Sequence, residues 1–211
     1  MTTTSDILIH EPWVNKERQQ EAYAFGIWCF LATELLFFSA LFLGYAVVRH
    51  LHIVGFDTGA KETSIVFGTV NTAVLMTSSL TMAMAERSAE QKRARLARWM
   101  LIATLLLGAT FVVVKGFEYR EDIEKHLVPG HGFSVPFQGA QLFFAFYWVM
   151  TGVHAVHLSI GLGVVGRLLR LSYRHSLSEH RASVEVTTLY WHLVDVIWVV
   201  LYPCFYLVNR S

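Results

Sequence analysis

Long apolar stretches alternate along the chain with short clusters of charged residues. A helix that spans a membrane needs about 20 predominantly apolar residues, and five stretches reach that length. They are 24–48, 65–85, 96–117, 137–166 and 186–208. The pattern predicts an all-α membrane protein, with an N-terminal tail over 1–23 and a single five-helix membrane domain over 24–208. Because the connections are short, neighbouring helices should pack antiparallel in one bundle.

Positive charge is divided unequally between the two sides that these five helices define. Eleven Lys and Arg residues lie in the tail and in or beside the second and fourth connections, whereas six lie on the opposite side. Loops rich in Lys and Arg stay in the cytoplasm. The N-terminus is therefore predicted to be cytoplasmic and the C-terminus to lie outside.

Composition narrows the class of protein further. Hydrophobic residues make up 54% and charged residues 16% of the 211 positions, against about 45–50% and about 25% in globular chains. The net charge of +1 and the lack of a basic tract argue against nucleic-acid binding. Cys29 and Cys204 each lie inside an apolar stretch without metal or redox spacing, so we expect buried free thiols.

Two stretches carry signals for helix packing. Small side chains let helices approach closely within a membrane, and in the fourth stretch they recur every four positions, at Thr151, Ala155, Ser159 and Gly163. The second stretch is uncharged but polar, and we expect it to be largely enclosed by neighbouring helices or by another subunit. Its polar residues are Thr69, Asn71, Thr72, Thr77, Ser78 and Thr81.

Glu34 lies near the middle of the first stretch. A carboxylate at the centre of a spanning helix costs about 2.5–3.5 kcal/mol on insertion scales, so this group should be protonated, paired or hydrated. Two roles follow from that. One is a structural hydrogen bond, and the other is the handling of protons or contact with a lipid headgroup.

Two further pairs of polar residues lie within apolar stretches. His154 and His157 are three positions apart, as are His192 and Asp195, so each pair shares one helix face. Three His and one Asp form an adequate ligand set for a metal, but no local motif such as HExxH accompanies them. An interhelical hydrogen-bond network is the alternative, and it needs no metal.

The third stretch carries polar groups near its ends. Glu118 and Tyr119 follow its outer end and could join that hydrogen-bond network. Arg98 and Lys115 lie close to its two ends, where long side chains can extend toward the membrane surface.

Four blocks, together with the Glu118–Tyr119 pair, resemble subunit III of haem–copper respiratory oxidases. They read Ala-Thr-Glu-Leu-Leu-Phe-Phe at 32–38, Asn-Thr-Ala-Val-Leu at 71–75, Thr-Gly-Val-His-Ala-Val-His at 151–157 and Tyr-Trp-His-Leu-Val-Asp-Val-Ile-Trp at 190–198. The blocks occur in the family's order and extend over about 24–208. The chain is most similar to the short, five-helix bacterial form, since it lacks the two helices that begin the long form. The lipid cleft of the long form would then be incomplete here unless another subunit fills it.

The resemblance implies a non-catalytic subunit that carries no metal or haem of its own. Haems and copper would belong to partner subunits I and II of a proton-pumping complex that reduces oxygen to water. Glu34 corresponds to the family's carbodiimide-reactive glutamate. The implied roles are to stabilise subunit I, to bind structural phospholipid and to support proton uptake from the cytoplasmic side. The implied location is the bacterial inner membrane, and membership of a respiratory supercomplex is compatible with it.

Several alternatives stay open at this point. The resemblance favours a cytochrome c oxidase, but a quinol oxidase subunit III or a homologue associated with nitric oxide reductase would share these motifs. The His and Asp residues could instead indicate an independent membrane cytochrome. Glu34 and Asp195 could indicate a proton-coupled transporter, although five helices do not divide into inverted repeats.

Overall fold

The computed structural model describes residues 16–135, 137–174 and 177–208. Within these ranges the structure is helical and contains no strand. Five long helices dominate it, namely α1 (Lys16–Leu51), α3 (Ile65–Glu90), α4 (Ala94–Glu124), α5 (Gln138–Arg174) and α6 (Arg181–Tyr202). Five segments of these helices are long and apolar enough to span a membrane, so the predicted all-α, five-helix membrane fold is confirmed.

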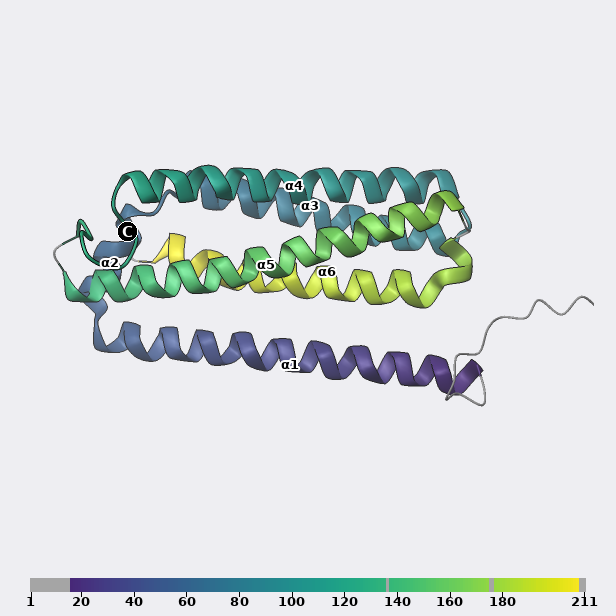
Figure 1. The fold of residues 1–211 in the computed structure, drawn as a ribbon, viewed down its shortest axis with the longest axis horizontal. Helices are drawn as coiled ribbons and strands as arrows, with labels where there is room; N and C mark the ends of the chain where they lie inside the picture. The colour runs from purple at the N-terminus through teal and green to yellow at the C-terminus, as the bar shows by residue number, and fades with distance from the viewer. Residues whose placement is uncertain (1–15, 136, 175–176, 209–211) are drawn as a thin grey trace, which may run out of the picture.

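Four of the long helices form a bundle beside which α1 lies as a separate layer (Figure 1). In the bundle α3 packs on α4 and α6, and α5 packs on the same two helices. Buried side chains recur every three or four residues along each helix, as at Gly68, Asn71, Leu75 and Ser78 of α3, which is the spacing of one helix face. Trp191 and Trp198 of α6 fill the centre of the bundle with no exposed surface.

Helix α1 contacts the rest of the chain through a narrow stripe. Its buried side chains are Leu31, Phe38 and Tyr45, which are seven positions apart and therefore lie on one line along the helix. Most other α1 side chains are exposed, including Cys29. The expectation of a buried thiol at Cys29 is wrong because this helix leaves most of its surface uncovered in the single chain. Cys204 is partly buried, and both thiols are free.

The helices extend beyond the apolar stretches that predict them. Helix α4 continues to Glu124 and α5 to Arg174. Backbone hydrogen bonding continues into charged sequence, and pairs of opposite charge four residues apart stabilise such exposed turns. Arg120–Glu124 at 2.9 Å and Lys125–Glu121 at 2.6 Å are pairs of this kind at the end of α4.

Two short elements close the end of the bundle at which α1 ends. Helix α2 (Ile53–Glu62), which the sequence pattern did not predict, places Gly55 so close to Gly139 of α5 that a Cβ atom would lie 2.3 Å from the Gly139 Cα. A π-helical turn over Pro203–Leu207 (η2) follows α6. The Tyr45 hydroxyl donates to the Cys204 carbonyl, and Thr63 Oγ1 donates to the Phe205 carbonyl at 3.0 Å. These bonds connect α1 and the end of α2 to the C-terminal segment.

The polar residues of α3 are only partly enclosed within this chain, and enclosure of the others by another subunit stays a prediction. Asn71 and Ser78 are buried, but Thr69 and Thr77 are exposed. The Thr77 hydroxyl donates to the Ala73 carbonyl and that of Thr72 to the Gly68 carbonyl, both at 2.8 Å. Since a threonine can satisfy its own hydroxyl in this way, a polar helix need not be surrounded by protein.

The small residues of α5 do not form one contact face within this chain. Thr151 is fully buried and Ala155 partly buried, whereas Ser159 and Gly163 are exposed. With 3.6 residues per turn, a four-residue spacing rotates around the helix by about 40° at each step. The stripe therefore turns from the core to the surface, and a packing role for its outer half stays a prediction.

Candidate functional site

An apolar crevice separates α1 from the α5–α6 pair. It has a volume of about 420 Å³ and is lined by Ile27, Phe30, Glu34, His157, Ile160, Val164, Val186, Thr187 and Tyr190. A second hollow of about 600 Å³ shares Ile27, Phe30 and Val186 with it and adds Ala22, Gly26, Arg167, Ala182 and Ser183. Because the two share a wall, we treat them as one crevice. Its lining extends from Glu34 to Ala22 along α1 and as far as Arg167 along α5. These residues lie toward the end of the bundle where α1 begins and α5 ends (Figure 1).

Glu34 and His157 form an ion pair or hydrogen bond across this crevice. The Glu34 Oε2 and His157 Nε2 atoms are 2.8 Å apart, and the two side chains are 19% and 17% exposed. The Phe38 ring packs edge-on against the imidazole, with centroids 5.3 Å apart. The Tyr190 hydroxyl donates to the His157 carbonyl at 3.0 Å, which holds α6 beside this turn of α5.

The contact that His157 Nδ1 makes shows which ring nitrogen carries a hydrogen atom. His157 Nδ1 is 2.9 Å from the Val153 carbonyl oxygen, which only accepts, so Nδ1 carries a hydrogen. The Nε2–Glu34 contact then needs one further hydrogen. It is supplied either by a protonated Glu34 or by an imidazolium that faces a carboxylate. In both cases one hydrogen atom lies between the two side chains.

A second polar cluster lies inside the bundle near the opposite end from Arg167. Lys115 is only 3% exposed. Its Nζ donates to Glu118 Oε2 at 3.0 Å, to the Tyr147 hydroxyl at 3.0 Å and to the Tyr206 hydroxyl at 2.7 Å. The expectation that Lys115 extends to the membrane surface is wrong, because acceptors on three segments of the chain hold the ammonium group in the core.

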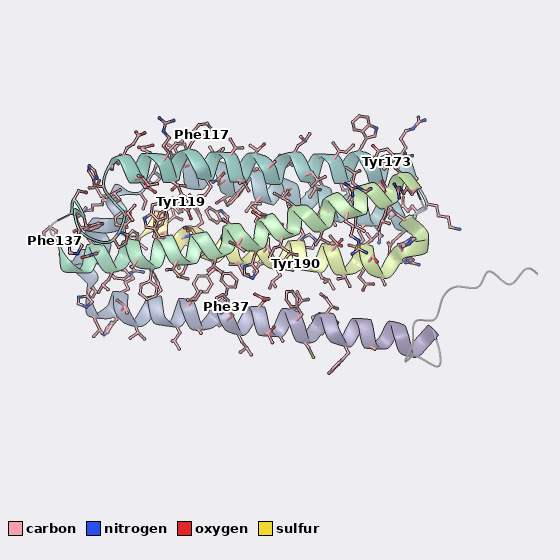
Figure 2. All side chains as sticks on the ribbon, in the orientation of Figure 1. Phe37, Phe117, Tyr119, Phe137, Tyr173 and Tyr190 are labelled. Atoms are coloured by element: carbon pink, nitrogen blue, oxygen red, sulfur yellow. The ribbon has the colours of Figure 1, made fainter. Side chains whose placement is uncertain are left out.

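Aromatic rings surround the same ammonium group. The ring centroids of Tyr147, Tyr119, Tyr206 and Trp198 lie 4.5, 4.9, 5.4 and 5.6 Å from Lys115 Nζ, distances at which a cation is attracted to the ring faces. Figure 2 shows Tyr119 on the side of α4 that faces α5 and Phe117 on the opposite side. The Tyr119 hydroxyl is 2.7 Å from Thr151 Oγ1.

A third set of polar contacts joins α3 to α6. His192 Nδ1 is 2.8 Å from Ser79 Oγ, and the Trp191 indole donates to Ser78 Oγ at 3.1 Å. Asp195 lies beside Ser79, but its carboxylate oxygens have no hydrogen-bond partner among the described residues. His192 and Asp195 thus share a helix face without forming a bond to each other.

His154 is isolated from the other candidate residues. It is fully buried between Phe111 and Trp198, with ring centroids 5.6 and 5.1 Å away. Neither of its ring nitrogens has a hydrogen-bond partner among the described residues. The predicted single network of His154, His157, His192 and Asp195 is therefore divided, because its members face different neighbouring helices. In the described part of the chain no group of three or more His, Cys, Asp or Glu side chains could hold a metal.

Sequence reasoning missed the partners of Glu118. Lys115, Glu118 and Asp122 occupy positions i, i+3 and i+7 of α4, a spacing that places them on one helix face. A charged row of this kind beside an apolar helix could have indicated a buried cluster. Tyr147 and Tyr206 carried no such signal, because aromatic residues are frequent along the whole chain.

Comparison with known proteins identifies relatives over almost the whole chain. The family model described as cytochrome c oxidase subunit III matches residues 14–209. The chain is 30% identical to cytochrome c oxidase subunit 3 of Thermostichus vulcanus, over 88% of this chain and 87% of the relative. It is 32% identical to the protein of the same name in Corynebacterium diphtheriae, over 87% of each chain. It is 29% identical to cytochrome bo(3) ubiquinol oxidase subunit 3 of Pseudomonas aeruginosa, over 88% and 84%.

Lys115→Met should strongly destabilise the protein. The substitution leaves the Glu118 carboxylate buried without its cation, a change that costs about 3–5 kcal/mol. The matched control is Arg120→Met, which breaks the exposed pair with Glu124 and should cost less than about 1 kcal/mol. Thermal unfolding of the purified complex compares the two. Adding Glu118→Gln to Lys115→Met should recover part of the loss, and equal effects of the two single substitutions would contradict the assignment.

Proposed function

The chain belongs to the cytochrome c oxidase subunit III family, and we propose that it serves as the non-catalytic subunit III of a proton-pumping terminal oxidase. Family membership makes it part of a multi-subunit respiratory oxidase, and its five spans make it a multi-pass membrane protein. In the proposed complex, subunits I and II carry the haems and copper, and this chain binds none of them. Its main contact is with subunit I, which it stabilises.

The proposed electron donor is cytochrome c. The family model and the two relatives described above at 30% identity or more are named for cytochrome c oxidase, while other relatives are named quinol oxidase subunits. A quinol oxidase is therefore the second candidate. Oxygen uptake by the purified complex with reduced cytochrome c or with a quinol as the sole donor decides between them.

The proposed orientation places the N-terminus in the cytoplasm of a bacterial cell and the C-terminus outside the inner membrane. The excess of Lys and Arg in the tail and in the connections on the same side supports it. Arg167 then lies near the cytoplasmic surface, at one end of the crevice, and the buried Lys115 lies toward the outer surface.

The observation that carries the proposed proton role is the Glu34–His157 pair. The Glu34 Oε2 and His157 Nε2 atoms lie 2.8 Å apart, in helices long enough to span a membrane and beside an apolar crevice. A carboxyl group in such a place is accessible to apolar reagents such as carbodiimides. The carboxyl oxygen adds to the central carbon of the carbodiimide, and a carbodiimide nitrogen takes up the proton. We propose that this subunit supports proton uptake by subunit I through the Glu34–His157 pair.

The same crevice has the chemistry of a phospholipid site. Its walls are mainly apolar and its length follows the helices, as an acyl chain would. Arg167 at the cytoplasmic end offers a cation where a lipid phosphate would lie. Glu34 and His157 supply ionisable side chains to the smaller hollow.

Deletion of this chain should leave the haems of the complex in place but shorten its working life during turnover. Haem content is read from the optical spectrum, and working life from the decline of oxygen uptake at constant donor concentration. Restoring the wild-type gene is the control. A complex that assembles and lasts equally well without this chain would count against the proposed role.

Glu34→Ala should abolish carbodiimide labelling of this chain and leave oxygen reduction largely intact. The rate of proton uptake should fall by less than about tenfold, or about 1.4 kcal/mol in the barrier, because the main pumping groups are expected in subunit I. Glu124→Ala, which removes an exposed carboxylate, is the matched control and should keep the labelling. Complete loss of oxygen reduction in an intact complex would show that the assigned role is wrong.

Arg167→Gln should reduce the amount of phospholipid that co-purifies with the complex. An Arg near the membrane surface contributes about 1 kcal/mol to headgroup binding, which corresponds to about a fivefold change in affinity. Arg170→Gln is the control, since Arg170 is exposed and does not line the crevice. Quantitative lipid mass spectrometry makes the comparison, and equal retention by both variants would argue against lipid in the crevice.

A further inference from the structure

The cluster around Lys115 can be analysed by counting hydrogen atoms. Its members, which we call the Lys115 cluster, are Lys115, Glu118, Asp122, Tyr147 and Tyr206. In addition to the three bonds from Lys115 Nζ, the Tyr206 hydroxyl contacts Glu118 Oε1 at 2.6 Å. The Tyr147 hydroxyl contacts Glu118 Oε1 at 3.0 Å and Asp122 Oδ2 at 2.8 Å. The cluster thus contains six polar contacts, and each of them requires one hydrogen atom.

Without a protonated carboxyl group, the cluster has too few hydrogens. An ammonium group supplies three and each phenol supplies one, so fully protonated Lys115, Tyr147 and Tyr206 provide five. The three hydrogens of Lys115 and the one of Tyr206 are used in their own contacts. The single hydrogen of Tyr147 then has to serve two carboxyl oxygens, one on Glu118 and one on Asp122. A sixth hydrogen is missing.

The net charge of the cluster also indicates one additional proton. Glu118 and Asp122 are 1% and 4% exposed, and two carboxylates against one ammonium would leave a net negative charge in the core. An uncompensated buried charge is strongly unfavourable. One added proton makes the cluster neutral and supplies the missing hydrogen at the same time.

Tyr147 connects the two possible positions of that proton. If Asp122 is protonated, it donates to the Tyr147 hydroxyl, which donates to Glu118. If Glu118 is protonated, both donations are reversed, and Tyr147 donates to Asp122. The heavy atoms do not have to move between these two arrangements, because Tyr147 already lies within 3.0 Å of both carboxyl oxygens.

Three of the groups that face this pair of carboxyls are part of the count. Tyr119 and Lys125 also lie near the pair but are not counted, because the Tyr119 hydroxyl is bonded to Thr151. Lys115 lies on the same helix, Tyr147 projects from α5, and Tyr206 projects from η2. Lys125 follows α4 and is engaged by Glu121 at 2.6 Å. Asp122 lies in the last turn of α4, where its carbonyl accepts the Leu127 N–H at 2.9 Å. This position puts it next to the loop at the end of the bundle.

We infer that the Lys115 cluster is a binding site for a single proton, which Glu118 and Asp122 share through Tyr147 and which exchanges with solvent at the loop end of the bundle. The site is separate from the Glu34–His157 pair and does not depend on the proposed function. Its binding group is a carboxyl that stays neutral beside an ion pair formed by the other carboxyl and Lys115.

Infrared spectra of the purified oxidase complex test this inference directly. Asp122→Asn and Glu118→Gln are the informative variants, since each replaces a carboxyl group with an amide of the same shape that can still donate a hydrogen. Glu124→Gln, which removes an exposed carboxylate on the same helix, is the control. At neutral pH, subtracting the Asp122→Asn or the Glu118→Gln spectrum from the wild-type spectrum should leave the C=O band of a protonated carboxyl group. Subtracting the Glu124→Gln spectrum should leave carboxylate bands only.

The pH dependence of stability gives a second readout. If the folded protein binds one proton more than the unfolded chain, raising the pH above about 5 destabilises it, by at most about tenfold in the folding equilibrium per pH unit. Asp122→Asn cannot lose this proton, so its melting temperature should fall less than that of the wild type as the pH rises. The inference is overturned if neither variant removes a protonated carboxyl band, or if the two melting curves stay parallel over the whole pH range.

Discussion

Inside a bilayer no water is present to satisfy a polar side chain, so each one must find its partner within the protein. This constraint explains the most unusual feature of the bundle, a lysine in its core. Lys115 joins α4 to α5 and to the C-terminal turn through hydrogen bonds to Glu118, Tyr147 and Tyr206. The same constraint explains why the hydroxyls of α3 bond to their own backbone. Asn71, His154 and Asp195 are exceptions, because each has buried polar atoms without a partner among the described residues.

Helix α1 differs from the other long helices, because only a narrow stripe of its side chains is buried against the bundle. The loose attachment opens the crevice that contains Glu34, and it leaves most of the helix surface free for lipid or for a partner subunit. A carboxyl group placed deep in the core would be closed to reagents, whereas one on the wall of this crevice is accessible and still paired with His157. The two groups that we propose to bind a proton thus differ in access. One lies beside a lipid-sized crevice, and the other is enclosed at the opposite end of the bundle.

The features that could be predicted from the sequence are those that depend on local composition. Five spans followed from the length of the apolar stretches, and Glu34 was recognised because a carboxylate inside such a stretch is costly. Its pairing with His157 could not be predicted, since it depends on which face of α5 meets α1. The side chain of Lys115 was wrongly predicted to extend to the membrane surface. A position near the end of a span is compatible with either a surface-reaching or a buried lysine, so the sequence did not distinguish the two. Helix α2 was missed because its buried face consists mainly of small residues, Gly55, Gly59 and Ala60, beside a single large one, Phe56.

The central claim is that this chain is an accessory subunit that holds no haem. The most direct test is to purify the chain under mild detergent, record its optical spectrum, identify the bound proteins by mass spectrometry, and then separate them. The account predicts co-purification with a larger haem-containing subunit, with all haem absorbance following that subunit after separation. Haem retained by the isolated chain would contradict the account, as would a chain that purifies alone from membranes in which the oxidase is assembled.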